Sequence, residues 1–160
     1  MKRSSVLQAI RNLLTGAGVP FREVHHEPTL TSEDSARARG EELRFGGKAL
    51  LVKGDGKFRL FVLPADRKVD SSEIRRTLKL RKLRFASGEE LLELTGLVPG
   101  SVPPFGEPIL PIPLFVDSSI SANERIAFNA GSLTDSIIMS VKDYLEVAAA
   151  NQIFRFSADR

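Results

Sequence analysis

The sequence predicts a single α+β domain over residues 1–160, with a mixed or largely antiparallel β-sheet and helices packed against it. The chain is shorter than the length at which hydrophobic cores usually divide. Its composition, 42% hydrophobic and 27% charged, is typical of a folded globular protein. Helical and strand-like segments alternate, yet several strands are joined by tight hairpins. A purely parallel sheet does not allow such hairpins.

The N-terminal quarter predicts two helices with a strand between them. Apolar residues recur at helical spacing over residues 4–18, where Ser4 is a candidate N-cap. Residues 19–26 form a short strand-like run. A second helix is expected over residues 31–40, because Thr31 stands at its start with an acidic residue three positions later.

The clearest local signal is a β-hairpin over residues 48–64. Two apolar runs flank the Gly-Asp-Gly turn of residues 54–56. Both runs are almost continuously apolar rather than alternating, which is typical of strands buried on both faces. We therefore expect the hairpin in the middle of the sheet.

The remaining elements follow from capping boxes, glycine stops and short β-branched runs. We expect helices over residues 69–80, 87–96 and 141–152, and strands over residues 82–87, 112–117, 125–131 and 136–140.

A stiff loop interrupts this order. Residues 96–111, "GLVPGSVPPFGEPILP", contain three glycines and five prolines. Proline fixes the backbone and removes N–H donors, while glycine lets a ligand approach the main chain closely. The loop is therefore either a rigid connection or a preorganised set of peptide groups facing a substrate.

Positive charge is concentrated in residues 67–84, where eight of eighteen residues are Lys or Arg and two are acidic. The whole chain carries a net charge of +3 with a pI near 9.4. Such a segment can contact phosphates, or it can be a solvated helix face followed by an edge strand. The candidate nucleic-acid contacts are Arg75, Arg76, Lys79, Arg81 and Lys82.

Several function classes are excluded or disfavoured. The absence of cysteine excludes disulfides, thiolate catalysis and cysteine-ligated zinc. His25 and His26, the only histidines, are adjacent in a predicted strand and so face opposite sides, which argues against a shared metal site. No P-loop, dinucleotide fingerprint or G-x-S-x-G elbow is present. No run is long enough to span a membrane, and we expect a cytoplasmic protein.

Four stretches, taken together in this order, resemble the YbaK / prolyl-tRNA-synthetase-associated editing-domain family. The resemblance covers about residues 20–147. The stretches are "GGKALLVK" (46–53), "LRFASGEELLELTG" (83–96), "GLVPGSVPPFG" (96–106) and "IAFNAGSLTDSIIMSVKDYL" (126–145).

This resemblance implies a barrel-like mixed sheet flanked by helices and an aminoacyl-tRNA editing activity. Members of the family hydrolyse the ester of mischarged tRNA, typically tRNA for proline bearing alanine, cysteine, serine or threonine. Some are insertions in a synthetase and others stand alone, so the expected partners are aminoacylated tRNA and an aminoacyl-tRNA synthetase. No cofactor, metal or membrane is implied.

The resemblance also implies site residues. The Gly-x-x-x-Pro loop matches residues 100–104, whose backbone would hold the terminal adenosine and the aminoacyl carbonyl. The implied catalytic residues are Lys48, Gly100, Ser101 and Pro104. The implied substrate-binding residues are Val102, Pro103, Phe105, Asn129, Gly131, Ser132, Thr31 and Ser32, with Thr29 nearby.

Lys48 would hold the terminal phosphate or ribose, and Lys53, on the opposite face of the same strand, is its competitor. The implied reaction is attack of water on the ester, helped by the ribose hydroxyl of the substrate. This suits a sequence without a convincing protein base, because positioning and oxyanion stabilisation can suffice for a reactive ester. Two alternatives remain open: a non-catalytic module that binds tRNA or a synthetase, and a hydrolase of small acyl esters.

Overall fold

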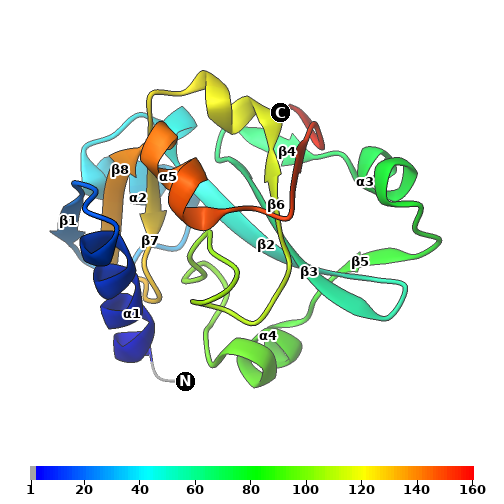
Figure 1. The fold of residues 1–160 in the computed structure, drawn as a ribbon, viewed down its shortest axis with the longest axis horizontal. Coiled ribbons are helices and arrows are strands. Elements are labelled where there is room, and N and C mark those ends of the chain that lie inside the picture. The colour runs from blue at the N-terminus through cyan, green and yellow to red at the C-terminus, as the bar shows by residue number, and fades with distance from the viewer. Residues whose placement is uncertain (1–2) are drawn as a thin grey trace.

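The computed structural model describes residues 3–160, with side chains from residue 6 onward (Figure 1). Its helices are α1 (Arg3–Gly16), α2 (Ser32–Arg39), α3 (Ser71–Leu78), α4 (Gly88–Thr95) and α5 (Val141–Ala148), with 3-10 turns η1 (Leu43–Phe45) and η2 (Ser118–Ala122). Its strands are β1 (Arg22–His25), β2 (Gly47–Gly54), β3 (Lys57–Pro64), β4 (Arg67–Val69), β5 (Leu83–Phe85), β6 (Leu114–Asp117), β7 (Arg125–Asn129), β8 (Asp135–Ser140), β9 (Gln152–Phe154) and β10 (Ser157–Asp159). None of the helices in this part of the chain is long and apolar enough to cross a membrane.

The strands form three sheets. The largest has the order β5-β2-β3-β6-β9, in which β2 pairs antiparallel with both β3 and β5, while β3–β6 and β6–β9 are parallel. The others are the antiparallel sheet β1-β8-β7 and the pair β10-β4. The predicted α+β class with a mixed sheet is confirmed, and the β2–β3 hairpin lies inside the largest sheet as expected.

Side chains of β3 explain why that hairpin reads as continuously apolar. Leu60 and Val62 belong to the larger core, which also contains α1, α5 and the three-stranded sheet. Phe61 and Leu63 face the opposite side and pack with Ile74 of α3 in a second core. Because successive side chains in a strand alternate, burial on both faces requires an unbroken apolar run.

One edge of β2 is paired at both ends and open in between. A parallel bridge joins Gly46 to Ala127 of β7, and β5 pairs with β2 only from Val52 to Gly54. Residues 48–51 have no neighbouring strand on this edge within residues 3–160. The sheets in the described chain therefore stop short of a closed barrel, and the opening lies where the predicted site residues gather.

Three short strands, β4, β9 and β10, were absent from the predictions. The final helix, expected to continue to residue 152, ends at Ala148, and Ala149 adopts a left-handed conformation with φ of 46°. Asn151 then bonds to both main-chain groups of Leu114 and begins the pairing with β6. The run "AAANQ" has high helix propensity locally, but these tertiary hydrogen bonds override it.

Ser4 lies within α1 and not at its N-cap. The other N-caps expected from the sequence agree with the structure: Thr31 caps α2, the Asp70 side chain accepts from the Glu73 N–H at the start of α3, and Ser87 with Glu90 forms a full capping box on α4.

Candidate functional site

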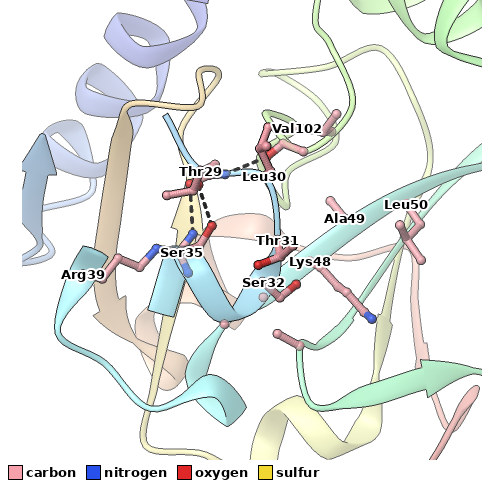
Figure 2. Close-up of a pocket in the computed structure, with 15 residues that line it drawn as sticks. Thr29, Leu30, Thr31, Ser32, Ser35, Arg39, Lys48, Ala49, Leu50 and Val102 are labelled. Atoms are coloured by element: carbon pink, nitrogen blue, oxygen red, sulfur yellow. Dashed lines mark hydrogen bonds between the residues drawn. The ribbon is translucent and has the colours of Figure 1, made fainter. Parts of the chain in front are cut away.

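A cavity of about 200 Å³ opens at the unpaired edge of β2. It lies between the segment leading into α2, the first half of β2, the end of β7 and the Pro/Gly loop (Figure 2). Its lining residues are Thr29, Leu30, Thr31, Ser32, Ser35, Arg39, Gly46, Gly47, Lys48, Ala49, Leu50, Ala65, Gly100, Val102 and Asn129.

This cavity brings together six of the residues expected at the site, which come from four distant parts of the sequence. They are Thr31, Ser32, Lys48, Gly100, Val102 and Asn129. Ser101, Pro103, Pro104, Phe105, Gly131 and Ser132 do not line it. Those residues hold the loop and the adjoining turn in place.

The loop is fixed through its carbonyl groups. The side-chain amide of Asn129 donates to the Gly100 carbonyl oxygen at 2.7 Å, and the Gly131 N–H donates to the Ser101 carbonyl oxygen at 3.0 Å. The fully buried Ser101 hydroxyl donates to the Val98 carbonyl oxygen at 2.7 Å. These hydrogen bonds connect the loop to the end of β7 and also link Ser101 to Val98 within the loop.

The second half of the loop is anchored in the core. The Tyr144 hydroxyl donates to the Pro104 carbonyl oxygen at 2.6 Å, and burial raises the pKa of this phenol far above its ordinary value. Phe105 is 1% exposed and packs edge-on against Phe128 and Tyr144. Phe105 is therefore a core residue that supports the loop, and it does not line the cavity.

Two loop residues that line the cavity have main-chain N–H groups that are not used within the described chain. The N–H groups of Gly100 and Val102 have no hydrogen-bond partner within residues 3–160, and both residues line the cavity. Gly100 has φ of +87°, a conformation that side chains of L-residues rarely adopt. A loop clamped by its carbonyls with N–H groups left free is suited to stabilising a developing oxyanion.

Lys48 lies on the outer wall of the cavity. Its side chain extends away from Arg39 and Thr29 (Figure 2). Burial lowers the pKa of the Lys48 ammonium, and the nearby Arg160 guanidinium lowers it further, while Glu33 and Asp66 oppose both effects. Lys53, its competitor, is engaged elsewhere, with its ammonium 3.9 Å from Glu90.

Arg39 forms the inner wall and was missed in the sequence. It is 8% exposed, donates from Nε to the Ser136 hydroxyl at 2.9 Å and from Nη2 to the Asn129 side-chain oxygen at 3.0 Å. No carboxylate lies within ion-pair distance of it in the described chain, and burial lowers its pKa to about 10. By holding the oxygen of Asn129, Arg39 orients the amide that reaches Gly100.

Hydroxyl groups complete the polar wall. The Thr29 and Ser35 hydroxyls share a buried hydrogen bond of 2.7 Å. Thr31 accepts from the Asp34 N–H as the cap of α2, so it serves the helix as well as lining the cavity. Ser35 and Arg39 are four residues apart on α2, and that spacing is the sequence signal that could have revealed a polar helix face at the site.

The two histidines lie outside the cavity. His25 contacts the Asp135 carboxylate at 2.9 Å, and His26 contacts the Ser136 hydroxyl at 2.8 Å. Ser132 bonds to the same carboxylate, at 2.7 Å, within the turn between β7 and β8. In residues 3–160, no cluster of three His, Cys, Asp or Glu side chains is arranged to hold a metal ion.

The basic residues lie apart from the cavity. Arg75 and Arg76 are on α3, which is on the far side of the largest sheet from β7 (Figure 1). Arg76 pairs with Glu73 at 2.5 Å. Lys79, Arg81 and Lys82 follow on the exposed turn into β5, and none of these five residues lines the cavity.

Comparisons with known proteins match this architecture. The family model described as "Aminoacyl-tRNA editing domain" matches residues 26–147. The Multifunctional Ser/Thr-tRNA deacylase ProXp-y of Escherichia coli K12 is 37% identical over 155 residues, covering 92% of this chain and 90% of that protein. A proline–tRNA ligase of Bacillus licheniformis is 33% identical over 110 residues, which are 69% of this chain and 19% of the ligase. The crystal structure of hypothetical protein APE2540 has the same fold, with a TM-score of 0.82 at 24% identity over 93% of this chain and 99% of the other.

Proposed function

The chain belongs to the aminoacyl-tRNA editing domain family, and we propose that it is a deacylase that hydrolyses the ester of mischarged tRNA. The observation that carries the proposal is the convergence of Lys48, Gly100 and Asn129 on one cavity. A cation, a pair of free N–H groups and a polar wall are what an aminoacyl ester at the end of a polyanion requires.

We propose serine and threonine as the amino acids removed. The wall formed by Thr29, Ser35 and Arg39 offers hydrogen bonds to a side-chain hydroxyl, and the similar Escherichia coli protein is named a Ser/Thr-tRNA deacylase. A site that bonds a substrate hydroxyl rejects analogues lacking it much more strongly than an apolar pocket rejects a missing methylene. Alanine and cysteine esters should therefore be poorer substrates.

The residues divide the work as follows. Lys48 attracts a phosphate or the ribose region at the mouth of the cavity. The N–H groups of Gly100 and Val102 stabilise the oxyanion that forms when water attacks the ester carbonyl. Asn129 and Arg39 hold the loop in the geometry that keeps those groups aimed. The vicinal ribose hydroxyl of the substrate takes part in activating the water, because none of the described residues that line the cavity is His, Asp or Glu.

We further propose that the protein acts in trans on tRNA for proline. The matched region of the proline–tRNA ligase supports a shared substrate class, and the similar deacylase, of which this chain covers 90%, supports action apart from a ligase. A synthetase is the second partner expected on this account.

Deacylation assays test the proposal. tRNA for proline is charged in turn with alanine, cysteine, serine, threonine and proline, and each ester is incubated with wild type, Lys48→Ala and Lys53→Ala. We expect wild type to release serine and threonine. Lys48→Ala should lose this activity, and Lys53→Ala should retain it. Tight binding of the tRNA without hydrolysis of any ester would instead support a binding module, and equal hydrolysis of esters lacking the tRNA body would indicate a small-ester hydrolase.

A further inference from the structure

A second cavity, of about 190 Å³, adjoins the first at the same open edge of β2. The two share Ala49, Leu50, Gly100 and Val102. The second cavity is bounded on its other side by Phe85 of β5 and by the start of α4. A ligand with its ester at the Gly100 loop would therefore have a second part within reach of Phe85.

Phe85 is unusual for an aromatic residue in this chain. Its side chain is 56% exposed, whereas Phe45, Phe61, Phe105 and Phe128 are at most 1% exposed. It pairs with Val52 across the strands, which places it on the same face of the sheet as Leu50. An exposed ring beside an apolar wall is a platform on which a flat base can stack.

The edge of β2 adds a polar element to this platform. The Ala86 N–H donates to the Leu51 carbonyl oxygen at 2.9 Å, so the main chain of Leu51 faces β5. Because main-chain groups alternate in direction along a strand, the N–H and C=O of Ala49, two residues earlier, point to the same edge. No strand covers them within residues 3–160. One donor and one acceptor side by side match the N1 and N6 edge of adenine.

One cation, Lys48, lies on the same face of β2 as Leu50. Lys48, Leu50 and Val52 alternate with their neighbours and so share one face of β2, which leads from the mouth of the first cavity toward Phe85. The order on this face is a cation, an apolar side chain and an aromatic ring. A nucleotide has matching parts, a phosphate and a flat base joined by ribose.

We propose that the second cavity is the subsite for the adenine base of the nucleotide that carries the ester, with the base stacked on Phe85 and its edge bonded to the Ala49 main chain. This inference rests on the proposed function for the placement of the ester. It adds the position of the base and the residue that binds it.

Two minimal esters test the subsite without the tRNA body: 3′-O-seryl adenosine and the same seryl ester on a ribose that lacks the base. Each is given to wild type, Phe85→Ala and Leu92→Ala. Leu92 is the matched control, because it is 54% exposed on α4 and lines neither cavity. A stacked base contributes enough that truncating its aromatic partner lowers kcat/KM on the adenosine ester by about tenfold.

We expect this loss in Phe85→Ala on the adenosine ester alone, expressed in KM more than in kcat, with recovery in Phe85→Trp. The base-free ester should react equally with all three proteins, and an inosine ester, whose ring edge has donor and acceptor exchanged, should react more slowly than the adenosine ester. Equal losses of Phe85→Ala on both esters, or equal rates of wild type with and without the base, would overturn the proposal.

Binding separates this outcome from failure of the proposed function. If wild type hydrolyses neither ester, calorimetry with the unreactive amide 3′-seryl-amino-3′-deoxyadenosine still measures the subsite. Binding that is about tenfold weaker in Phe85→Ala than in Leu92→Ala supports the base subsite even if neither minimal ester is hydrolysed, and the assays with charged tRNA then decide separately whether the protein is a deacylase. No difference between the two variants rejects the subsite itself.

Discussion

Asn129 bonds through its two side-chain atoms to two different parts of the site: its amide donates to the Gly100 carbonyl oxygen at 2.7 Å, and its oxygen accepts from Arg39 at 3.0 Å. Replacing Arg39 would therefore disturb the loop even though Arg39 does not touch it. Strand β7, helix α2 and the Pro/Gly loop meet at this one amide.

Asn129→Ala should lower deacylation strongly. The change frees the Gly100 carbonyl and leaves the Arg39 guanidinium with one buried partner fewer, so the N–H groups of the loop lose their fixed direction. We expect kcat to fall by about tenfold, which is less than the roughly 10²–10³-fold loss on removing an oxyanion-hole donor itself, because Asn129 only holds the donors in place. Asn12→Ala on the exposed face of α1 is the control, and unchanged kcat in Asn129→Ala would contradict the assigned role of the amide.

Gly100→Ala and Gly56→Ala form a matched pair. Both glycines have positive φ, +87° and +83°, so alanine should cost roughly 1–2 kcal/mol of stability at either position. Only Gly100 lines the cavity, where an added Cβ would also meet Leu133 at 3.3 Å. We expect similar losses in unfolding free energy by urea titration, with loss of deacylation confined to Gly100→Ala.

Tyr144→Phe tests the anchor beneath the loop. The change removes the hydroxyl that bonds to the buried Pro104 carbonyl and leaves that acceptor without a partner, which costs about 1–3 kcal/mol. We expect a lower midpoint in urea and a smaller kcat. A variant with wild-type stability would show that the carbonyl finds another donor.

The charge of Lys48 gives the reaction an alkaline limit. Because burial and Arg160 lower its pKa, the neutral amine should appear at a lower pH than for a free lysine, whose pKa is about 10.4. Activity that depends on the ammonium should decline as the pH rises through this lowered pKa. Rates corrected for spontaneous hydrolysis measure the limit, and Lys48→Arg, which stays charged, should show no decline from this group.

The same shift predicts the sign of a stability effect. A depressed pKa in the folded state means that burying the ammonium opposes folding at neutral pH, and that this opposition fades as the pH rises through the folded pKa. Lys48→Met should therefore raise the melting temperature near neutral pH while lowering deacylation. A fall in the melting temperature would contradict this reading of the lysine environment.

The basic turn should contribute to tRNA binding through charge alone. The main chain there is held by Asp55, which accepts from the N–H groups of Arg81 and Lys82, while the two side chains remain exposed. Arg81→Ala with Lys82→Ala should weaken binding and flatten the dependence of log K on log salt, by about one unit of slope per lost phosphate contact. Lys142→Ala on α5 is the control, and an unchanged slope would place the tRNA elsewhere.

The sequence predicted the parts of the fold whose signals are local. The hairpin of residues 48–64 and the caps of α2 and α4 depend on neighbouring residues, and each agrees with the structure. Strands β4, β9 and β10 have three residues each, and their pairing partners are distant in sequence. β5 is equally short and was expected, so length alone does not explain the omission; β4, β9 and β10 are held by pairing partners far along the chain, which no local pattern reveals.

The candidate site also contains residues that the sequence predicted and one that it did not. Lys48, Gly100 and Asn129 were predicted from the family resemblance, and they converge on the cavity. Arg39 was missed because an arginine on a short polar helix ordinarily faces solvent. Its burial depends on Ser136 and Asn129, ninety or more residues away, which no local pattern reveals.

The most direct measurement is a single-turnover assay of seryl-tRNA for proline, with the enzyme in excess and release of free serine followed in time. We predict a rate at least about a hundredfold above the spontaneous hydrolysis of the ester, with the prolyl ester of the same tRNA left intact. A serine release rate equal to that in buffer, from folded protein that binds the tRNA, would contradict the central claim that this cavity hydrolyses the ester.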